Sequence, residues 1–396
     1  MSAPAHRVPG GSLALSGERL AAVYRLAAAD EAGAREEARA IAVEQTIEFP
    51  ADLVAAGDIR DHVVGRVESL RCIDEGGATD RYEATISYAV EVAGGRSAGA
   101  ELTQLLNLVF GNVSLKPGIR LERLELPPAI LDRLRGPRFG RDGLRRRLAA
   151  PERPLLATAV KPMGLSCREL AGLAYRFALG GIDVVKDDHG LTDQSFAPFR
   201  ERVERCVAAV ERANRETGGR TFYMPNVTAP ANELLERALF ARRAGAGGLL
   251  VAPGLVGLDS LRRLADDERV DLPIMAHPSW LGGFLASPAS GISHGVLLGQ
   301  LPRLAGADAT IFPSWGGRFP FTRGGCRAIA AATGAPLGGL RPIFPVPAGG
   351  MSLGSVPEML AVYGRELIFL IGGGLHRHGP DLVESCRHFR RLVEGL

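Results

Sequence analysis

The sequence predicts an α/β protein whose carboxyl-terminal part is a (β/α)8 TIM barrel. From residue 155 onward, short runs rich in Val, Ile, Leu and Phe alternate with longer amphipathic stretches, as in successive strand and helix units. Polar residues and glycines repeatedly follow the apolar runs, where a barrel carries its functional loops. The first 150 residues differ from this pattern, so a smaller domain is expected before the barrel.

Eight strands are expected in the barrel. Eight parallel strands with covering helices over about 240 residues are close to the usual length of this fold. An open doubly wound sheet is the alternative arrangement. The predicted strands are Leu155–Val160, Ile182–Lys186, Thr221–Val227, Gly248–Ala252, Leu272–His277, Ala307–Phe312, Arg341–Val346 and Leu367–Ile371.

The part before the barrel is expected to be an α+β domain of the ferredoxin-like type. Residues 1–12 are predicted to be a short flexible tail, and the segment Met1–Gly11 has no apolar run of the signal-peptide type. The domain itself takes residues 13–130, a solvated, partly helical basic linker takes 131–150, and the barrel takes 151–396. Within the domain, strands are predicted at Ala21–Ala27, Val64–Ile73 and Tyr82–Val92, and a helix at Glu31–Ala42.

Composition indicates a cytoplasmic enzyme. Hydrophobic residues make up 46% of the 396 residues, which is enough for two cores. A net charge of +3 and 6% aromatic residues do not indicate a nucleic-acid partner, and no segment is predicted to span a membrane. The five cysteines are scattered, so we interpret them as reduced packing residues.

The segment after the second barrel strand carries the strongest chemical signal. Lys186 ends an apolar run, Asp188 lies two residues on and points the same way in an extended chain, and His189 follows at the turn. Such a cluster can hold a divalent metal ion. The alternative is a structural ion pair between Lys186 and either Asp187 or Asp188.

Other strand ends also carry candidate site residues. Glycine runs after strands seven and eight let backbone amides approach an anion, and barrels often bind phosphate at these two loops. A phosphorylated substrate is therefore expected, although glycines also serve ordinary turns. The candidates at the strand ends are Lys161, Asn226, Thr228, His277, Ser314–Arg318, Gly349, Gly350, Gly372, Gly373, Gly374 and His376.

Several motifs resemble the large subunit of ribulose bisphosphate carboxylase over nearly the whole chain. They are Lys161-Pro162, the segment Gly180-Gly-Ile-Asp-Val-Val-Lys-Asp-Asp188, His277, Gly372–Gly374, Val43-Glu-Gln-Thr46 and Val109-Phe-Gly-Asn-Val113. The resemblance implies a homodimer with shared active sites, or a higher assembly of dimers. Glu44 and Asn112 would then contribute to the site of the partner chain.

The resemblance also implies chemical roles. Lys186 would take up carbon dioxide as a carbamate, and Asp188 would help to bind one Mg²⁺ per site. Lys161 would be a proton donor or base next to the enolised carbon. These roles are chemically coherent, because a carbamate gives a hard cation an oxygen ligand and the metal stabilises an enediolate.

The departures from the carboxylase are equally informative. His189 stands where the carboxylase has a carboxylate ligand, and Pro278 stands where it has a phosphate-binding arginine. The segment Lys161–Ser166 lacks the second lysine, and the loop Ser314–Phe319 lacks the lysine that helps to capture the gas. Carboxylation of ribulose bisphosphate is therefore not expected.

The sequence thus resembles the non-fixing, carboxylase-like branch of the family, and most closely its 5-methylthioribulose 1-phosphate isomerases of methionine salvage. Lys161 and Lys186 are the first candidates for proton transfer, followed by His277 and by His294, which lies in a helix predicted at Ser290–Leu301 and could instead be a cap or packing residue. Trp280 or Trp315 could contact the methylthio group, or simply anchor its loop. Two alternatives remain: a decarboxylase or hydrolase of a phosphorylated 3-oxo sugar acid (of the 3-oxo-isoapionate 4-phosphate type), and a non-catalytic binding protein.

Overall fold

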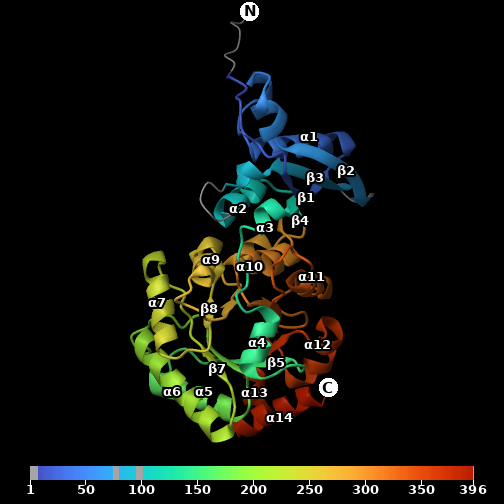
Figure 1. Cartoon of the computed structure of the whole chain (residues 1–396). Helices are drawn as coiled ribbons and strands as arrows, with labels where there is room; N and C mark the ends of the chain where they lie inside the picture. Colours follow the sequence, from blue (N-terminus) through green and yellow to red (C-terminus); the bar gives the residue numbers. More distant parts are fainter. Residues whose placement is uncertain (1–7, 75–79, 95–100, 396) are drawn as a thin grey trace, which may run out of the picture. The chain divides into compact units, whose positions relative to one another are not determined.

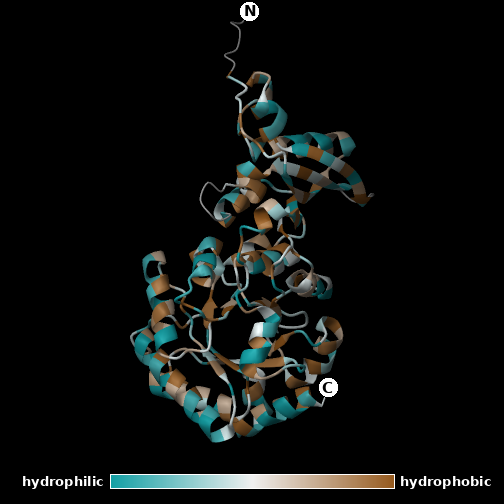
Figure 2. Ribbon diagram, viewed as in Figure 1, coloured by the Kyte–Doolittle hydropathy of each residue, from teal (hydrophilic) through white to brown (hydrophobic). Residues whose placement is uncertain are grey.

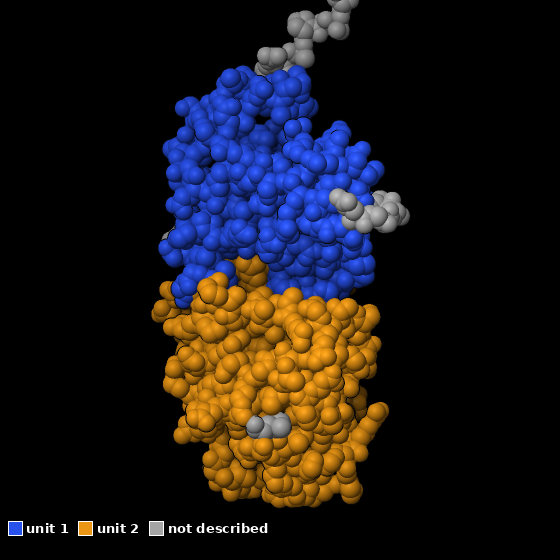
Figure 3. Space-filling model, turned by 90° about the vertical axis from the view of Figure 1, so that its right-hand side faces the viewer, with its two compact units in different colours: residues 1–134, 281–297, 337–339 blue, residues 135–280, 298–336, 340–396 orange. Residues whose placement is uncertain are grey.

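The chain forms two compact units, each with its own sheet structure, in a computed structural model that describes residues 8–74, 80–94 and 101–395 (Figure 1). Unit 1 contains residues 1–134, 281–297 and 337–339, and unit 2 contains residues 135–280, 298–336 and 340–396 (Figure 3). Within the described ranges, no helix is long and apolar enough to cross a membrane.

Unit 1 has the predicted ferredoxin-like α+β fold. Its sheet has the strand order β10-β4-β1-β3-β2, in which all pairs are antiparallel except β10 with β4. Asp30 caps the first helix by accepting a hydrogen bond from the Gly33 N–H. The elements are β1 (Arg19–Ala28), α1 (Glu31–Glu44), β2 (Arg66–Asp74), β3 (Asp80–Ala89), α2 (Leu102–Phe110), β4 (Ile119–Glu125), α3 (Pro128–Leu131) and β10 (Gly291–Ile292), with short turns of other helix types at Ala51–Leu53, Ile59–Val63, Val90–Ala93, Asn112–Leu115 and Leu281–Phe284.

Two strands of unit 1 differ from the prediction. The β4 strand was not predicted, although Ile119, Leu121 and Leu124 are buried on its apolar face. The segment 290–301 was expected to be one helix. It begins instead with β10, which adds to β4, and helical structure starts at His294.

Unit 2 contains the predicted barrel of eight parallel strands. β13-β5-β6-β7 and β12-β11-β9-β8 form its two halves, which are joined at one side by a parallel bridge between Asn226 and Leu250. Every residue of β5 is buried, as expected of a strand covered on both faces, and Figure 2 shows the brown apolar strands inside the helices. The strands are β5 (Leu155–Val160), β6 (Val184–Asp187), β7 (Phe222–Met224), β8 (Leu249–Val251), β9 (Ile274–Ala276), β11 (Ala309–Pro313), β12 (Phe344–Ala348) and β13 (Ile368–Leu370).

Most barrel strands are shorter than predicted, and proline explains one of the clearest cases. β7 ends at Met224, because Pro225 has no N–H group to continue the ladder. The helices that follow the strands are α5 (Cys167–Leu179), α6 (Phe199–Thr217), α7 (Ala231–Arg243), α8 (Pro253–Val256), α9 (Leu258–Asp266), α10 (Leu301–Leu304), α11 (Arg323–Gly334), α12 (Val356–Tyr363), α13 (Gly373–His378) and α14 (Leu382–Glu394), with shorter turns at Val296–Gln300 and Leu353–Ser355.

The basic segment 131–150 is not the solvated linker that was expected. Its helix α4 (Gly140–Leu148) buries Leu144 and Leu148 in the same apolar cluster as the barrel strands. The N–H groups of the cap and first residue of α4 donate to the buried carboxylate of Asp308, at 2.8 and 2.7 Å. Its arginines concealed this role, because only the spacing of two leucines marks the buried face.

Candidate functional site

Lys161, Lys186 and Asp188 meet at the carboxyl ends of β5 and β6. The parallel register pairs Val160 with Asp187, so Lys161 and Asp188 follow as neighbours. Lys161 Nζ lies 2.8 Å from Asp188 Oδ1. The structure therefore brings together three residues that the sequence singles out, at the face where barrels carry their active sites.

Lys186 is a buried lysine in a weakly solvating environment. Its side chain points into the strand-end cluster with only 3% of its surface exposed, and Nζ donates to the Asp187 carbonyl oxygen at 3.0 Å. Burial, reinforced by the nearby charge of Lys161, lowers the pKa of Lys186 to about 8, although Asp188 opposes the shift. At pH 7 roughly a tenth of Lys186 is therefore an uncharged amine, the form that reacts with carbon dioxide or accepts a proton, and this fraction rises to about half at pH 8.

Asp188 is ionised, and one of its carboxylate oxygens has no hydrogen-bond partner among the described residues. Burial alone would raise its pKa, but the His189 ring and the Lys161 ammonium group outweigh burial and hold the pKa of Asp188 well below its ordinary value. His189 Nδ1 lies 3.3 Å from Asp188 Oδ1. Lys161 Nζ and His189 Nδ1 both lie near Oδ1 without hydrogen-bond geometry, so this buried oxygen has no hydrogen-bond partner in the described part of the chain. A carboxylate oxygen left in this state suits a cation as ligand.

Asp187 has a different, structural task. Its fully buried carboxylate accepts from Arg202 Nε at 3.1 Å, from the Tyr223 hydroxyl at 2.6 Å and from the Asn226 N–H at 3.0 Å. The predicted alternative of a Lys186–Asp187 ion pair is thus wrong, because Arg202 takes that role. Arg202 lies 15 residues away in α6, and nothing in the local sequence pointed to it.

Asn226 helps to shape the loop that carries His189. Its side-chain amide donates to the carbonyl oxygens of His189 at 2.9 Å and Leu191 at 3.0 Å. Thr228 lies two residues after Asn226, and its hydroxyl accepts from the N–H of Ala252, which directly follows β8, at 3.0 Å. Both residues bond to backbone groups of neighbouring loops, so the structure gives them a supporting position.

His277 belongs to the lysine–aspartate cluster. Its ring stacks on His189, with ring centroids 4.4 Å apart and planes 8° from parallel. Burial, followed by the charge of Lys186, strongly lowers the pKa of His277. Its Nδ1 is contacted by the N–H of Ser279 at 3.2 Å and by the Ser279 hydroxyl at 2.8 Å. Ser279 was not among the predicted site residues, and only its spacing of two from His277 hints at this contact.

The other aromatic candidates are two tryptophans on barrel loops and His294. Trp280 is 77% exposed, whereas Trp315 packs on Tyr363 with ring centroids 5.1 Å apart. His294 lies in unit 1, where burial lowers its pKa. Trp315 therefore has the anchoring contact that was considered for it, and Trp280 presents an apolar surface.

The two glycine runs differ in their surroundings. A Cβ atom on Gly317 would meet the Gly349 carbonyl oxygen at 2.1 Å, so the loop after β11 packs closely on the first run. Gly374 is also tightly packed, with the Met351 carbonyl oxygen 2.9 Å from a Cβ atom. Around Gly372 and Gly373, in contrast, a Cβ atom would meet nothing within 4 Å. Of the second run, these two glycines have the open backbone that an anion could approach.

His376 is not brought to the Lys161–Asp188 pair by any described contact. Its ring lies edge-on to Phe177 of α5, with centroids 5.8 Å apart, and burial lowers its pKa. Its contact is thus with the outer helix layer.

In unit 1 the structure joins Glu44 and Asn112, which are 68 residues apart in the chain. Asn112 Nδ2 donates to Glu44 Oε1 at 3.0 Å. Gln45, which is buried, fixes the two segments: it donates to the Asn107 and Leu108 carbonyl oxygens, both at 2.8 Å, and accepts from the Val113 N–H at 3.1 Å. Gln45 is therefore the structural anchor of this pair.

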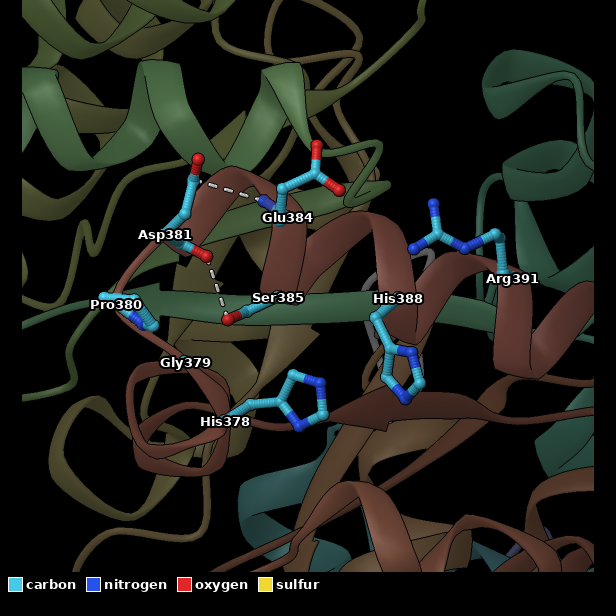
Figure 4. A pocket seen from close by; sticks show the side chains of 8 residues that line it. All are labelled: His378, Gly379, Pro380, Asp381, Glu384, Ser385, His388 and Arg391. Atoms are coloured by element: carbon cyan, nitrogen blue, oxygen red, sulfur yellow. Dashed lines mark hydrogen bonds between the residues drawn. The ribbon is translucent and has the colours of Figure 1, made fainter.

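A cavity of about 280 Å³ lies elsewhere, between α13 and α14 (Figure 4). The stacked rings of His378 and His388 line it, with centroids 4.4 Å apart. Its two carboxylates are already engaged, since Asp381 caps α14 and Glu384 pairs with Arg387 at 2.6 Å. None of the residues of the Lys161–Asp188 cluster lines this cavity.

Comparison with known proteins identifies the class to which this fold and cluster belong. The family model of the ribulose bisphosphate carboxylase large chain, catalytic domain, matches residues 141–317. A crystal structure of a Rubisco-like protein from Rhodopseudomonas palustris is similar with a TM-score of 0.84 and 39% identity, covering 95% of this chain and 97% of that one.

Three curated relatives indicate which branch of this family the chain resembles. Ribulose bisphosphate carboxylase-like protein 1 of Rhodopseudomonas palustris is 42% identical over 95% of this chain and 98% of its own length. A 5-methylthioribulose-1-phosphate isomerase of Rhodospirillum rubrum is 41% identical, covering 96% and 97%. A 2,3-diketo-5-methylthiopentyl-1-phosphate enolase of Geobacillus thermodenitrificans is 35% identical, covering 92% and 90%. The chain belongs to the RuBisCO-like proteins of the ribulose bisphosphate carboxylase family, as its motifs indicate.

Proposed function

We propose that this protein isomerises 5-methylthioribulose 1-phosphate in methionine salvage by a 1,3-proton transfer through an enediolate. The observation that carries the proposal is the cluster of Lys161, buried Lys186 and Asp188 at the mouth of the barrel. An amine with a pKa near the working pH can both remove a proton next to a carbonyl and return it. The 41% identity to an isomerase over 96% of the chain supports the substrate.

The lysines are proposed to perform the proton transfer. A neutral lysine takes the proton from the carbon on one side of the ketone and becomes an ammonium ion, and a 1,3-transfer returns a proton elsewhere on the enediolate. The carbonyl thereby moves along the sugar, with no net gain or loss of protons. Lys161 is 44% exposed and could reach a bound substrate, whereas Lys186 is buried beneath it.

Magnesium fits the residues present at this site. No cluster of three His, Cys, Asp or Glu side chains is ready to hold a metal within the described residues. Asp188, whose buried Oδ1 has no hydrogen-bond partner among those residues, and His189 would supply two ligands, and Lys186 would add oxygen ligands as a carbamate. In that form Lys186 is no longer a basic amine, so the proton transfer falls to Lys161. When bound, one Mg²⁺ per site would stabilise the negative charge that develops on the enediolate oxygens. His189 is a softer ligand than a carboxylate, so weaker Mg²⁺ binding than with three carboxylates is expected.

The phosphate is proposed to bind at the glycine runs. The open backbone at Gly372 and Gly373 supports this assignment most directly. Gly349, Gly350, Gly374 and His376 remain predicted contacts, although Gly374 is closely packed and His376 contacts Phe177.

We further propose a homodimer, or an assembly of dimers, in which Glu44 and Asn112 of one chain complete the barrel site of another. Their mutual hydrogen bond shows that unit 1 presents them together. The large exposed hydrophobic side chains found on the described part of unit 2 lie on loops that follow strands or, for Leu255, on the short helix α8 that follows β8. Such a collection of apolar groups on one functional face suits a surface covered by a second chain. These residues are Met163, Phe196, Leu255, Trp280 and Phe319.

The decisive experiment is proton NMR of 5-methylthioribulose 1-phosphate with the purified protein in deuterated water, first with Mg²⁺ and then with a chelator. Exchange together with a new ketose phosphate supports the isomerase, and loss of exchange under chelation supports the metal. No exchange would refute this substrate.

A second candidate is the enolisation of 2,3-diketo-5-methylthiopentyl 1-phosphate, which the 35% identical enolase favours. The two substrates share the phosphate and the methylthio group and differ by one molecule of water, so both should be tested in the same assay. Decarboxylation or hydrolysis of a 3-oxo sugar acid and a non-catalytic role stay predictions from sequence.

A further inference from the structure

His277 occupies the centre of the cluster with one ring nitrogen engaged and the other without a protein partner. Nδ1 lies 3.2 Å from the backbone nitrogen of Ser279, which can only donate, and 2.8 Å from the Ser279 hydroxyl. Nε2 makes no hydrogen bond with any residue in the described part of the chain, and the residue is only half-buried. A ligand can therefore meet Nε2.

The Ser279 contact decides where the proton of the ring lies. A peptide N–H always donates, so the Nδ1 that it contacts must present a lone pair. A ring that carries one proton must then carry it on Nε2. The hydroxyl of Ser279 can donate to the same lone pair and strengthens the preference.

On the basis of the proposed function, we propose that Ser279 is a positioning residue that holds His277 as the neutral Nε2–H tautomer, so that His277 donates a hydrogen bond to an enediolate oxygen. In this state Nε2 has no lone pair in the ring plane, so His277 can neither remove the carbon-bound proton nor bind the metal through Nε2. The proton transfer between carbons is left to Lys161 or Lys186.

The arrangement is chemically suited to enolisation. Surrendering the Nε2 proton would leave an imidazolate, so His277 keeps its proton and stabilises the oxyanion by hydrogen bonding alone. Triosephosphate isomerase uses a neutral histidine in the same way to polarise the carbonyl of its substrate. Stacking on His189, with planes 8° from parallel, restricts the ring to one orientation. A donor fixed in advance is most effective where charge develops during the reaction.

The first test needs no substrate. In the full-length protein labelled with ¹⁵N-histidine, long-range correlations between ring nitrogens and carbon-bound ring protons identify the protonated nitrogen, and the His277→Gln variant identifies the His277 signal. We expect a proton on Nε2 and a bare Nδ1. A proton on Nδ1, or on both nitrogens, would overturn the proposal even if the enzyme is active.

The second test separates a donor from a base. Glutamine can place an amide N–H near the position of Nε2, whereas the shorter asparagine reaches only the region of Nδ1. His277→Asn is expected to lower kcat by about 10²–10³-fold with little change in KM. His277→Gln is expected to keep roughly tenfold more activity than His277→Asn, since a regained hydrogen bond is worth about that much. Equal loss in both variants would indicate a base and contradict the inference.

Ser279 itself provides the matched pair of variants. Ser279→Ala keeps the backbone N–H, so the tautomer is expected to persist and kcat to fall only about fivefold. Ser279→Pro removes the N–H, and a mixture of tautomers with a larger fall in kcat is expected. If Ser279→Pro fails to fold, the wild-type tautomer still decides the question. If neither methylthio substrate reacts, the proposed function fails, while the tautomer measurement still tests the role of Ser279.

Discussion

Asp187 and Asp188 are adjacent carboxylates, and replacing each with asparagine is expected to have different effects. The change is expected to lower stability at Asp187 and activity at Asp188. Asp187→Asn removes the negative charge beside Arg202, whose side chain is fully buried. Removing one partner of a buried ion pair costs about 3–5 kcal/mol, because the other charge stays buried without compensation. Asp188→Asn, in contrast, affects the half-exposed Lys161, where an ion pair contributes about 1 kcal/mol or less.

The remaining contacts of Arg202 put the expected cost of Asp187→Asn at the lower end of this range of free energies. Its guanidinium keeps the carbonyl oxygens of Thr192 and Ala197, both at 2.6 Å, and the new amide oxygen can still accept one hydrogen bond. We expect a loss of about 3 kcal/mol in the free energy of unfolding. That is a large part of the free energy of unfolding of a typical protein, which is roughly 5–15 kcal/mol.

Urea unfolding followed by far-UV circular dichroism measures the free energy, and deuterium exchange into the substrate measures activity. Asp187→Asn is expected to be destabilised, whereas Asp188→Asn is expected to be nearly as stable as the wild type and about 10²–10³-fold less active. The reasoning fails if Asp187→Asn unfolds at the wild-type urea concentration. It also fails if Asp188→Asn remains active.

Three further predictions concern other parts of the molecule. Lys186, whose pKa is lowered to about 8, is expected to take up more carbon dioxide as pH rises from 7 to 9, because only the neutral amine reacts. A ¹³C carbamate signal from labelled bicarbonate that is pH-independent, or that persists in Lys186→Arg, would contradict this. Mixing inactive Lys161→Ala and Glu44→Gln proteins is expected to restore roughly a quarter of wild-type activity in randomly exchanged dimers. No recovery after proven subunit exchange would argue against shared sites. Gln45→Ala removes three hydrogen bonds to backbone groups in unit 1 and is expected to lower the free energy of unfolding by about 3 kcal/mol, measured by urea titration. A loss below about 1 kcal/mol would show that Gln45 is not the anchor.

The barrel was predictable because each of its strands can be recognised from a short apolar run in the sequence. The run Leu155–Val160 is apolar throughout, as a strand covered on both faces must be, and the structure reproduces its bounds. The strand Ile119–Glu125 was missed because arginines and glutamates interrupt its alternation. Helix α4 was misjudged for a similar reason, since Leu144 and Leu148 are few among its arginines.

The cluster of Lys161, Lys186 and Asp188 was predictable because each residue directly follows or ends an apolar run, and parallel strands bring their carboxyl ends together. The roles of the two aspartates were not. Alternation in β6 places Asp187 and Asp188 on opposite sides, but only the folded chain brings Arg202, Tyr223 and the Asn226 N–H to Asp187.

The barrel strands and the residues at their ends are thus determined by residues close together in the chain, and the sequence alone indicates them. Partnerships over long separations depend on packing: the Glu44–Asn112 bond, the position of α4 against the strands, and the lowered pKa of Lys186 all arise only when distant segments exclude water together. The tautomer of His277 belongs to the same class of facts. Ser279 is only two residues away, but the sequence does not say that its N–H points at Nδ1; the backbone of the loop after β9 in the folded chain does.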